Sequence, residues 1–517
     1  MQQALQDKSI AAGADRLRDG LRGLVLALAL VLAGFAAVAE ERKSPPANGQ
    51  SAGVLRLLPP DSITEHTLDI GDQTLAYTAT AGTLNLYGQG GDRSAAVFYT
   101  SYVLKGAARE NRPVTFAFNG GPGAASVFLH LGLAGPKILE FGPGGRDGAN
   151  IRLRDNPETW LAFTDLVMID PVGTGWSRPA KSDDGSNFWG VRSDAQSLAK
   201  VIALYVAHNA RSASPKYLLG ESYGGFRAVK VARALQQDQG IVAAGIVMVS
   251  PLIESPLQFG NTRFALGAAL QFPSLAAAEL ERRKALTKEA MDAVERFAMT
   301  EYLTTLAGPA PEGEAARVFY ARVAQMTGIP LDVVTKSRGF VRDNYAKRTR
   351  AAEAEVVSPY DASFAAPDPF PESDHRSGAD PVLDGFARAL GGAFADYARN
   401  KLGFKTEMTY MLLNSDVSRR WDWQGEGENR SSASVTSDMR ELLSLNPSFR
   451  VLIAHGYSDM VTPFGVSRYV VNHLPPMGAP ERVQLRLYRG GHMLYFIPES
   501  RAAFSADAKA FYRASPE

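Results

Sequence analysis

The sequence contains no cysteine. Its 517 residues therefore form no disulfide and no thiolate metal site, and they offer no thiol nucleophile and no lipid-modified cysteine. Histidine is also scarce, and no two histidines form a close metal-ligand pair such as His-Glu-x-x-His. We therefore predict that the protein uses no metal and no other cofactor. The seven histidines are His66, His130, His208, His375, His455, His473 and His492.

Neither sign of charge dominates the chain. Lysine and arginine together number 55 and aspartate and glutamate 54, and no long run has a single sign. A nucleic-acid-binding protein shows a basic patch or stripe, so we predict no nucleic-acid partner. An apolar content of 45% with 21% charged residues is typical of a globular protein. The length allows one large domain with an insertion, or two to three ordinary domains, and it specifies no oligomeric state.

One apolar run lies near the N-terminus. Residues 23–39 carry no charge, three arginines precede them, and Ala37-Val38-Ala39 closes the run. This pattern predicts a signal peptide over residues 1–39, cleaved after Ala39, and hence an exported protein, periplasmic or secreted, with no stable membrane association. The alternative is an uncleaved anchor, because the run has about the 17 residues that a bilayer span needs. The small-residue cleavage site favours the signal peptide. Residues 40–54 form the predicted linker.

The pattern of apolar residues predicts an α/β fold. Residues 73–80, 83–87 and 95–104 alternate like antiparallel edge strands. Uninterrupted apolar runs, separated by helical patterns such as residues 194–209, suit parallel strands that are buried on both faces. We therefore expect a mostly parallel central sheet with helices on both faces. The uninterrupted runs are residues 113–118, 166–170, 245–250 and 450–455.

The alternation of apolar strand runs with helical patterns stops between residues 256 and 434. The segment shows helical patterns at residues 275–300, 314–327 and 382–402, with loops between them. We interpret it as a helical cap inserted between two parts of the core, residues 55–255 and 435–517. Ligand sites in such sheets lie outside the carboxyl ends of the strands, where a cap would sit. The alternative is a separate helical domain that never touches the site.

A Gly-x-Ser-x-Gly motif centres on Ser222. Residues 217–221 look like a buried strand, and a helical pattern runs from the motif to about residue 236. A nucleophile elbow needs this strand, tight turn and helix, so we predict that Ser222 is a nucleophile. The alternative is a glycine-rich turn without chemistry, which is common in a chain with 48 glycines.

An acid and a histidine follow in the order that an α/β-hydrolase requires. Asp459 comes shortly after the strand pattern at residues 450–455, and His492 follows another at residues 483–489. His492 would accept the proton of Ser222, and Asp459 would hold its ring in the correct tautomer. Alternatively, Asp459 caps a turn and His492 is structural. Asp170 also follows a strand pattern, but it precedes the serine and is the weaker candidate.

Three motifs resemble the signatures of the serine carboxypeptidase family. They are Asn-Gly-Gly-Pro-Gly at residues 119–123, Gly-Glu-Ser-Tyr-Gly-Gly at 220–225 and Gly-Gly-His-Met at 490–493. Residues 156–160 and 171–177 resemble further landmarks. The resemblance covers about residues 115–250 and 450–504 and is faint over the insertion. It implies an α/β-hydrolase fold with a cap and a peptide substrate that loses its C-terminal residue through an acyl-enzyme.

The resemblance also implies further roles at the site. The backbone N–H groups of Gly121 and Tyr223 would form the oxyanion hole, and Asn119, Gly120 and Glu221 would bind the terminal carboxylate of the substrate. Asn119 can donate a hydrogen bond, but Glu221 can do so only when protonated, because two carboxylates in contact must share a proton. Without the resemblance, Asn119 would be a turn residue and Glu221 a solvated or salt-bridged acid.

The chain departs from the family pattern at three places. Ala117 stands where the family has a tryptophan, Ala124 where it has a disulfide cysteine, and Leu494-Tyr495 follows Met493 where a valine and a proline are usual. The missing tryptophan removes one expected contact to the substrate carboxylate. Two alternatives stand beside the carboxypeptidase: an esterase or acyltransferase, which the triad alone does not distinguish from it, and a catalytically silent binding protein.

Overall fold

The computed structural model describes residues 53–258, 264–424, 429–477 and 480–513. The predicted signal peptide and nearly all of the linker lie outside these residues. Among the described helices, none combines the length and the apolarity that crossing a bilayer requires. Residues 52–517 form a compact unit, which contains all the described elements.

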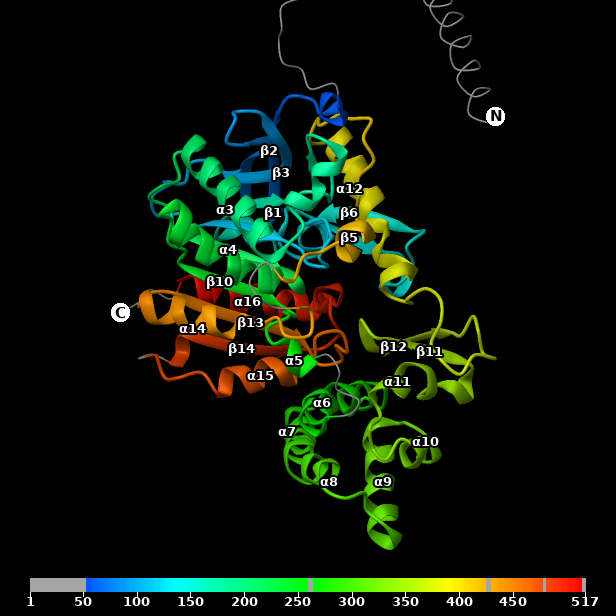
Figure 1. Cartoon of the computed structure of the whole chain (residues 1–517). Coiled ribbons are helices and arrows are strands. Elements are labelled where there is room, and N and C mark those ends of the chain that lie inside the picture. The colour runs from blue at the N-terminus through cyan, green and yellow to red at the C-terminus, as the bar shows by residue number, and fades with distance from the viewer. Residues whose placement is uncertain (1–52, 259–263, 425–428, 478–479, 514–517) are drawn as a thin grey trace, which may run out of the picture. The chain divides into compact units, whose positions relative to one another are not determined.

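A ten-stranded sheet forms the centre of this unit (Figure 1). Neighbouring strands from β1 to β7 are antiparallel, and those from β7 to β14 are parallel, as predicted. The spatial order is β1 (Ser62–Ile70), β2 (Gln73–Tyr87), β3 (Arg93–Leu104), β7 (Asp165–Ile169), β4 (Val114–Phe118), β9 (Lys216–Glu221), β10 (Gly245–Val249), β13 (Arg450–Gly456) and β14 (Val483–Tyr488), while β8 (Arg178–Pro179) pairs with β3.

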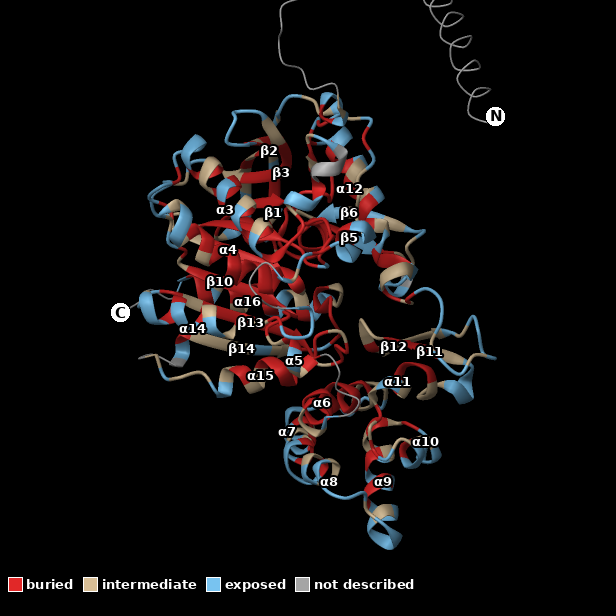
Figure 2. Ribbon diagram, in the orientation of Figure 1, coloured by how far each residue is buried: buried red, intermediate tan, exposed pale blue. Residues whose placement is uncertain are grey.

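Both faces of the sheet are buried by helices, so the predicted α/β-hydrolase architecture is confirmed. Along β4, Ala117 faces one apolar cluster and its neighbours Phe116 and Phe118 face the other, because successive side chains of a strand point to opposite faces. Figure 2 shows the central strands and the facing sides of the helices as buried. The first cluster is completed by α12 (Ala389–Asn400) and α16 (Pro498–Arg513), the second by α3 (Val191–His208), α4 (Tyr223–Gln239), α14 (Thr436–Leu445) and α15 (Phe464–Asn472).

The two strands predicted before residue 88 are one strand, so this prediction was wrong. β2 runs through Gly82 without a turn and pairs with β1 and β3 on either side. A side chain at Gly82 would collide with the carboxyl of Asp61, which accepts a hydrogen bond from Thr83 N at 2.9 Å. Gly82 therefore allows a close approach, where the sequence pattern suggested a turn.

The inserted segment is mostly helical, but its details differ from the prediction. The single helix expected at residues 275–300 is broken after Arg282, and α7 begins beyond Thr287, whose side chain caps it by accepting from Ala290 N at 3.2 Å. A two-stranded sheet was not predicted. The elements are α5 (Ser255–Gln258), α6 (Ala265–Arg282), α7 (Lys288–Phe297), α8 (Leu303–Ala307), α9 (Gly313–Thr327), α10 (Leu331–Lys336), α11 (Arg342–Arg348), β11 (Glu355–Ser358), β12 (Asp361–Pro367), α12 and α13 (Ser415–Arg419).

The insertion packs against the loops that follow β13 and β14. Its apolar core includes Met460 and Phe464, which come directly after β13. The hairpin of β11 and β12 also meets both loops, since Ala362 N donates to Ser458 O at 2.9 Å and His492 N to Tyr360 O at 2.6 Å. The insertion therefore contacts the two loops in which the sequence places the acid and the histidine.

Candidate active site

Ser222 sits on a strained turn between β9 and α4. Its φ of 61° is in a region that non-glycine residues rarely adopt. The glycines beside it are required sterically: a Cβ on Gly224 would lie 2.6 Å from Phe118 O, and one on Gly220 would collide with the backbone of the helix. The turn at the carboxyl end of β9 therefore has the geometry of a nucleophile elbow.

The acid and the histidine meet beyond the ends of β13 and β14. The ring Nδ1 of His492 lies 2.9 Å from Asp459 Oδ2. The other carboxylate oxygen, Oδ1, accepts from Val461 N at 2.7 Å and Thr462 N at 3.0 Å, which fixes the plane of the carboxylate. Both side chains are buried. Asp459 thus orients the ring and leaves the other ring nitrogen, Nε2, for proton transfer.

Charge and burial act on His492 in opposite directions. Burial lowers its pKa, but the carboxylates of Asp459 and Glu221 raise it, and the net result is a pKa above the ordinary value. The carboxylate of Asp459 stabilises the imidazolium that forms when the ring accepts a proton.

Asp170 does not take part in this arrangement. Its Oδ1 accepts from Ser126 N at 2.8 Å and from Tyr410 OH at 3.4 Å, and burial raises its pKa to about 7. No hydrogen bond joins it to His492 within the described residues. Asp459, and not Asp170, is the acid that contacts the histidine.

Ser222 and His492 line one cavity of about 470 Å³. No hydrogen bond joins their side chains among the residues that the structure describes. Catalytic hydrogen bonds commonly tighten only when a substrate binds. The cavity also contains Asn119, Gly120, Gly121 and Glu221, so most of the predicted site residues share one chamber.

The predicted oxyanion-hole residues lie next to one another. A Cβ on Gly120 would lie only 2.5 Å from Tyr223 N, so the Asn-Gly-Gly backbone passes directly beside the start of α4. Gly121 has a φ of 101°, which favours glycine. Gly121, Ser222 and Tyr223 line one small cavity, so both predicted oxyanion-hole residues border the space beside Ser222.

Glu221 is buried next to Ser222 and accepts two hydrogen bonds on one oxygen. Asn119 Nδ2 donates to its Oε2 at 2.6 Å and Tyr495 OH donates to the same atom at 2.8 Å. Burial raises the pKa of Glu221 to about 7, although the charge of His492 and these two donors oppose the shift. The carboxyl can therefore be protonated near neutral pH, which is the state that donates a hydrogen bond.

A buried ion pair supports the glycine loop. Arg227 on α4 donates to the backbone carbonyl of Asn119 and pairs with Asp194 on α3 at 2.6 Å, and both side chains are buried. Breaking such a pair costs about 3–5 kcal/mol. The sequence analysis missed Arg227; an arginine five residues beyond Ser222, on a helix face that is otherwise apolar, was the available signal.

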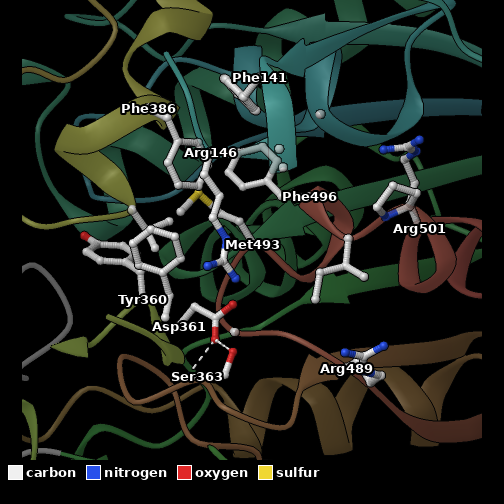
Figure 3. A pocket seen from close by; sticks show the side chains of 18 of the residues that line it. Phe141, Arg146, Tyr360, Asp361, Ser363, Phe386, Arg489, Met493, Phe496 and Arg501 are labelled. Carbon is white, nitrogen blue, oxygen red and sulfur yellow. Dashed lines mark hydrogen bonds between the residues drawn. The ribbon is translucent and has the colours of Figure 1, made fainter. Parts of the chain in front are cut away.

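A second cavity, of about 460 Å³, adjoins the first and shares Tyr360 and Met493 with it (Figure 3). Aromatic rings of Phe141, Phe386 and Phe496 line one side of it, and Arg146 extends into it. The insertion contributes residues to both chambers. None of the predicted carboxylate-binding residues lines this second cavity.

No metal-binding cluster is present in the described part of the chain, where no three His, Asp or Glu side chains are suitably grouped.

Comparisons with known proteins agree with this geometry. Residues 72–260 match the family model described as serine carboxypeptidase. No curated protein matches in sequence. The solved structure of Kex1Δp, a prohormone-processing carboxypeptidase from Saccharomyces cerevisiae, is similar with a TM-score of 0.54 and 13% identity, covering 84% of this chain and 91% of that one. At this identity the likeness shows the fold.

Two other solved structures are less similar. Proline iminopeptidase from Mycobacterium smegmatis has a TM-score of 0.35 and 14% identity, covering 87% of this chain and 97% of its own. A carboxyl esterase from Bacillus coagulans has a TM-score of 0.36 and 14% identity, covering 83% and 97%. Residues 72–260 thus match the serine carboxypeptidase family, and the sheet topology and the serine turn are those of an α/β-hydrolase fold.

Proposed function

We propose that the protein is a serine carboxypeptidase that releases C-terminal residues from peptides, with Ser222, His492 and Asp459 as its triad. Ser222 attacks the last peptide carbonyl while His492 accepts its proton. The Gly121 and Tyr223 N–H groups stabilise the oxyanion. His492 then protonates the departing amine, and water releases the remaining peptide from the acyl-enzyme.

Recognition of the free C-terminus is what distinguishes this function from that of an esterase or acyltransferase. The observation that carries it is the buried carboxyl of Glu221, beside Ser222 in the catalytic cavity and bonded to Asn119. Protonated Glu221 and the second amide hydrogen of Asn119, with the Gly120 backbone, would bind the terminal carboxylate. These donors serve only a substrate that ends in a free acid.

The pH dependence follows from the two titrating groups. His492 must be neutral, so activity is lost as pH falls through its raised pKa. Glu221 must be protonated, so hydrolysis of free-acid peptides is lost as pH rises above about 7. Glu221→Gln donates at every pH, so we expect it to remove the alkaline decline. The measurement is kcat/KM against pH for one free-acid peptide and one ester that lacks a carboxylate.

The ester is expected to show no decline of this origin in either protein. Glu281→Gln is the matched control, because burial also raises the pKa of Glu281 but that residue lines only the second cavity. If peptide and ester decline together at high pH in wild type and Glu221→Gln alike, Glu221 is not the carboxylate sensor.

We further propose that residues 256–434 act as a cap and that the protein is exported after cleavage at Ala39. The contacts of the insertion with Ser458 and His492 support the cap, and the apolar run at residues 23–39 supports export. N-terminal sequencing of the protein from its producing cell is expected to begin at or near Glu40. A cytoplasmic chain that retains Met1 would contradict export.

A further inference from the structure

The carboxyl group of Glu221 uses its two oxygens differently. Oε2 accepts from both Asn119 Nδ2 and Tyr495 OH. Oε1 accepts no hydrogen bond within the described residues. It is not one of their fully buried polar atoms either, so it remains accessible. Because Glu221 lines the catalytic cavity, Oε1 is the oxygen left for a ligand.

The direction of both hydrogen bonds is determined. Asn119 Oδ1 accepts from Leu129 N at 3.1 Å, so the amide nitrogen must face Glu221. An amide nitrogen only donates. Burial, with the nearby Glu221, raises the pKa of Tyr495 well above its usual value, so the phenol keeps its proton. Glu221 Oε2 is the only acceptor of that proton within the described residues, so the hydroxyl donates to it. A proton on Oε2 would therefore compete with two donors, whereas one on Oε1 would not.

We propose that Tyr495 is a positioning residue that, together with Asn119, keeps the proton of neutral Glu221 on Oε1, where it can be donated to the terminal carboxylate of the substrate. This inference rests on the proposed carboxypeptidase function. Tyr495 is one of the positions at which the histidine loop departs from the family pattern, and the inference gives that departure a role.

The position of the Tyr495 hydroxyl is fixed by packing. The residue lies on the turn η11 (Leu494–Phe496), three positions after His492, and it is fully buried. Its ring packs over Gly132, where a Cβ would lie 2.6 Å from ring atom Cε2. The loop that carries His492 thus also carries the hydroxyl that orients the carboxyl group of Glu221.

Other titratable groups near Glu221 affect its pKa. The charge of His492 lowers the pKa of Glu221, and that of Asp459 raises it. Tyr360, which lines the same cavity, is also influenced by Glu221, and burial raises its pKa to about 12. None of these groups is altered when only the Tyr495 hydroxyl is removed.

Tyr495→Phe tests the inference by deleting that hydroxyl. Loss of a donor to the charged form raises the pKa of Glu221, so the alkaline limb of kcat/KM for the free-acid peptide should move up by on the order of one pH unit. Because the proton is no longer confined to Oε1, KM for that peptide should rise by about fivefold while kcat changes little. The ester should be unaffected.

A binding measurement gives a second readout without turnover. In a Ser222→Ala background, calorimetry in two buffers of different ionisation heat counts the protons taken up when a tripeptide with a free C-terminus binds. At pH 8 we expect uptake of close to one proton, falling to about half a proton when Tyr495→Phe is added, because Glu221 is then already partly protonated. The corresponding tripeptide amide should take up none.

Tyr302→Phe is the matched control, because it deletes a buried hydroxyl that donates to Gly339 O at 2.7 Å, in the insertion and away from the cavity. If Tyr495→Phe is too unstable to assay, Gly132→Ala displaces the ring and should cause the same shift. An alkaline limb and proton count equal to wild type would overturn the role of Tyr495 alone. Identical pH profiles for acid and ester in wild type would overturn the proposed function itself.

Discussion

Replacing Ser222 with alanine is expected to reduce kcat by roughly 10⁶-fold, the size of loss that follows removal of a serine protease nucleophile. Alanine cannot form the acyl-enzyme, and it has the same Cβ at the strained φ of 61°, so the fold should keep its stability. Single-turnover peptide hydrolysis and the melting temperature measure the two effects.

A fluorophosphonate probe supplies the complementary observation. It should label wild type and Ser197→Ala, a control that removes a half-buried hydroxyl on α3, and it should fail to label Ser222→Ala. Absence of labelling in folded wild type would favour a silent binding protein. Peptide hydrolysis by Ser222→Ala at near the original rate would rule out Ser222 as the nucleophile.

Asp459→Asn is expected to cost on the order of 10⁴ in kcat. The N–H groups of Val461 and Thr462 require an acceptor at the Oδ1 position, so the new amide must place its oxygen there and its nitrogen toward His492. That nitrogen donates to Nδ1 and moves the ring proton to Nε2. His492 in this tautomer cannot accept the proton of Ser222, which is why the loss is large although the shape is conserved.

Asp170→Asn is the control for this prediction, since Asp170 was the rival acid and is equally buried. It contacts Ser126 and Tyr410 rather than His492, so kcat should remain close to wild type, with any cost appearing in the melting temperature. A fall in kcat for Asp170→Asn that matches the fall for Asp459→Asn would contradict the assignment of the acid.

The order of Ser222, Asp459 and His492 along the chain was enough to predict that they come together. Each follows a strand, and parallel strands end at the same edge of a sheet. The same uninterrupted apolar runs predicted β4, β7, β10 and β13 because strands buried on both faces need no polar alternation.

What the sequence did not reveal depends on contacts between distant segments. Gly82 looks like a turn residue until Asp61 is seen to occupy the space of its side chain. Arg227 and Asp194 lie on different helices, and Tyr495 reaches Glu221 only because two loops converge. No local pattern encodes such pairs.

The same limit applies to the insertion. What looked like one continuous helical pattern is two helices, because the side chain of Thr287 caps the start of the second. The hairpin of β11 and β12 is stabilised by contacts with the loop of Asp459, as at Ser458, whose hydroxyl donates to Asp361 at 2.7 Å. Apolar periodicity within the segment carries no information on these contacts.

The central claim is that the enzyme requires a free C-terminal carboxylate. The most direct measurement is a timed digestion of one peptide as its free acid and as its C-terminal amide, followed by mass spectrometry. We predict stepwise loss of single residues from the C-terminus of the acid, and cleavage of the amide slower by at least about tenfold, because a charge-assisted hydrogen bond is lost. Equal rates for acid and amide, or cleavage at internal bonds, would contradict the account.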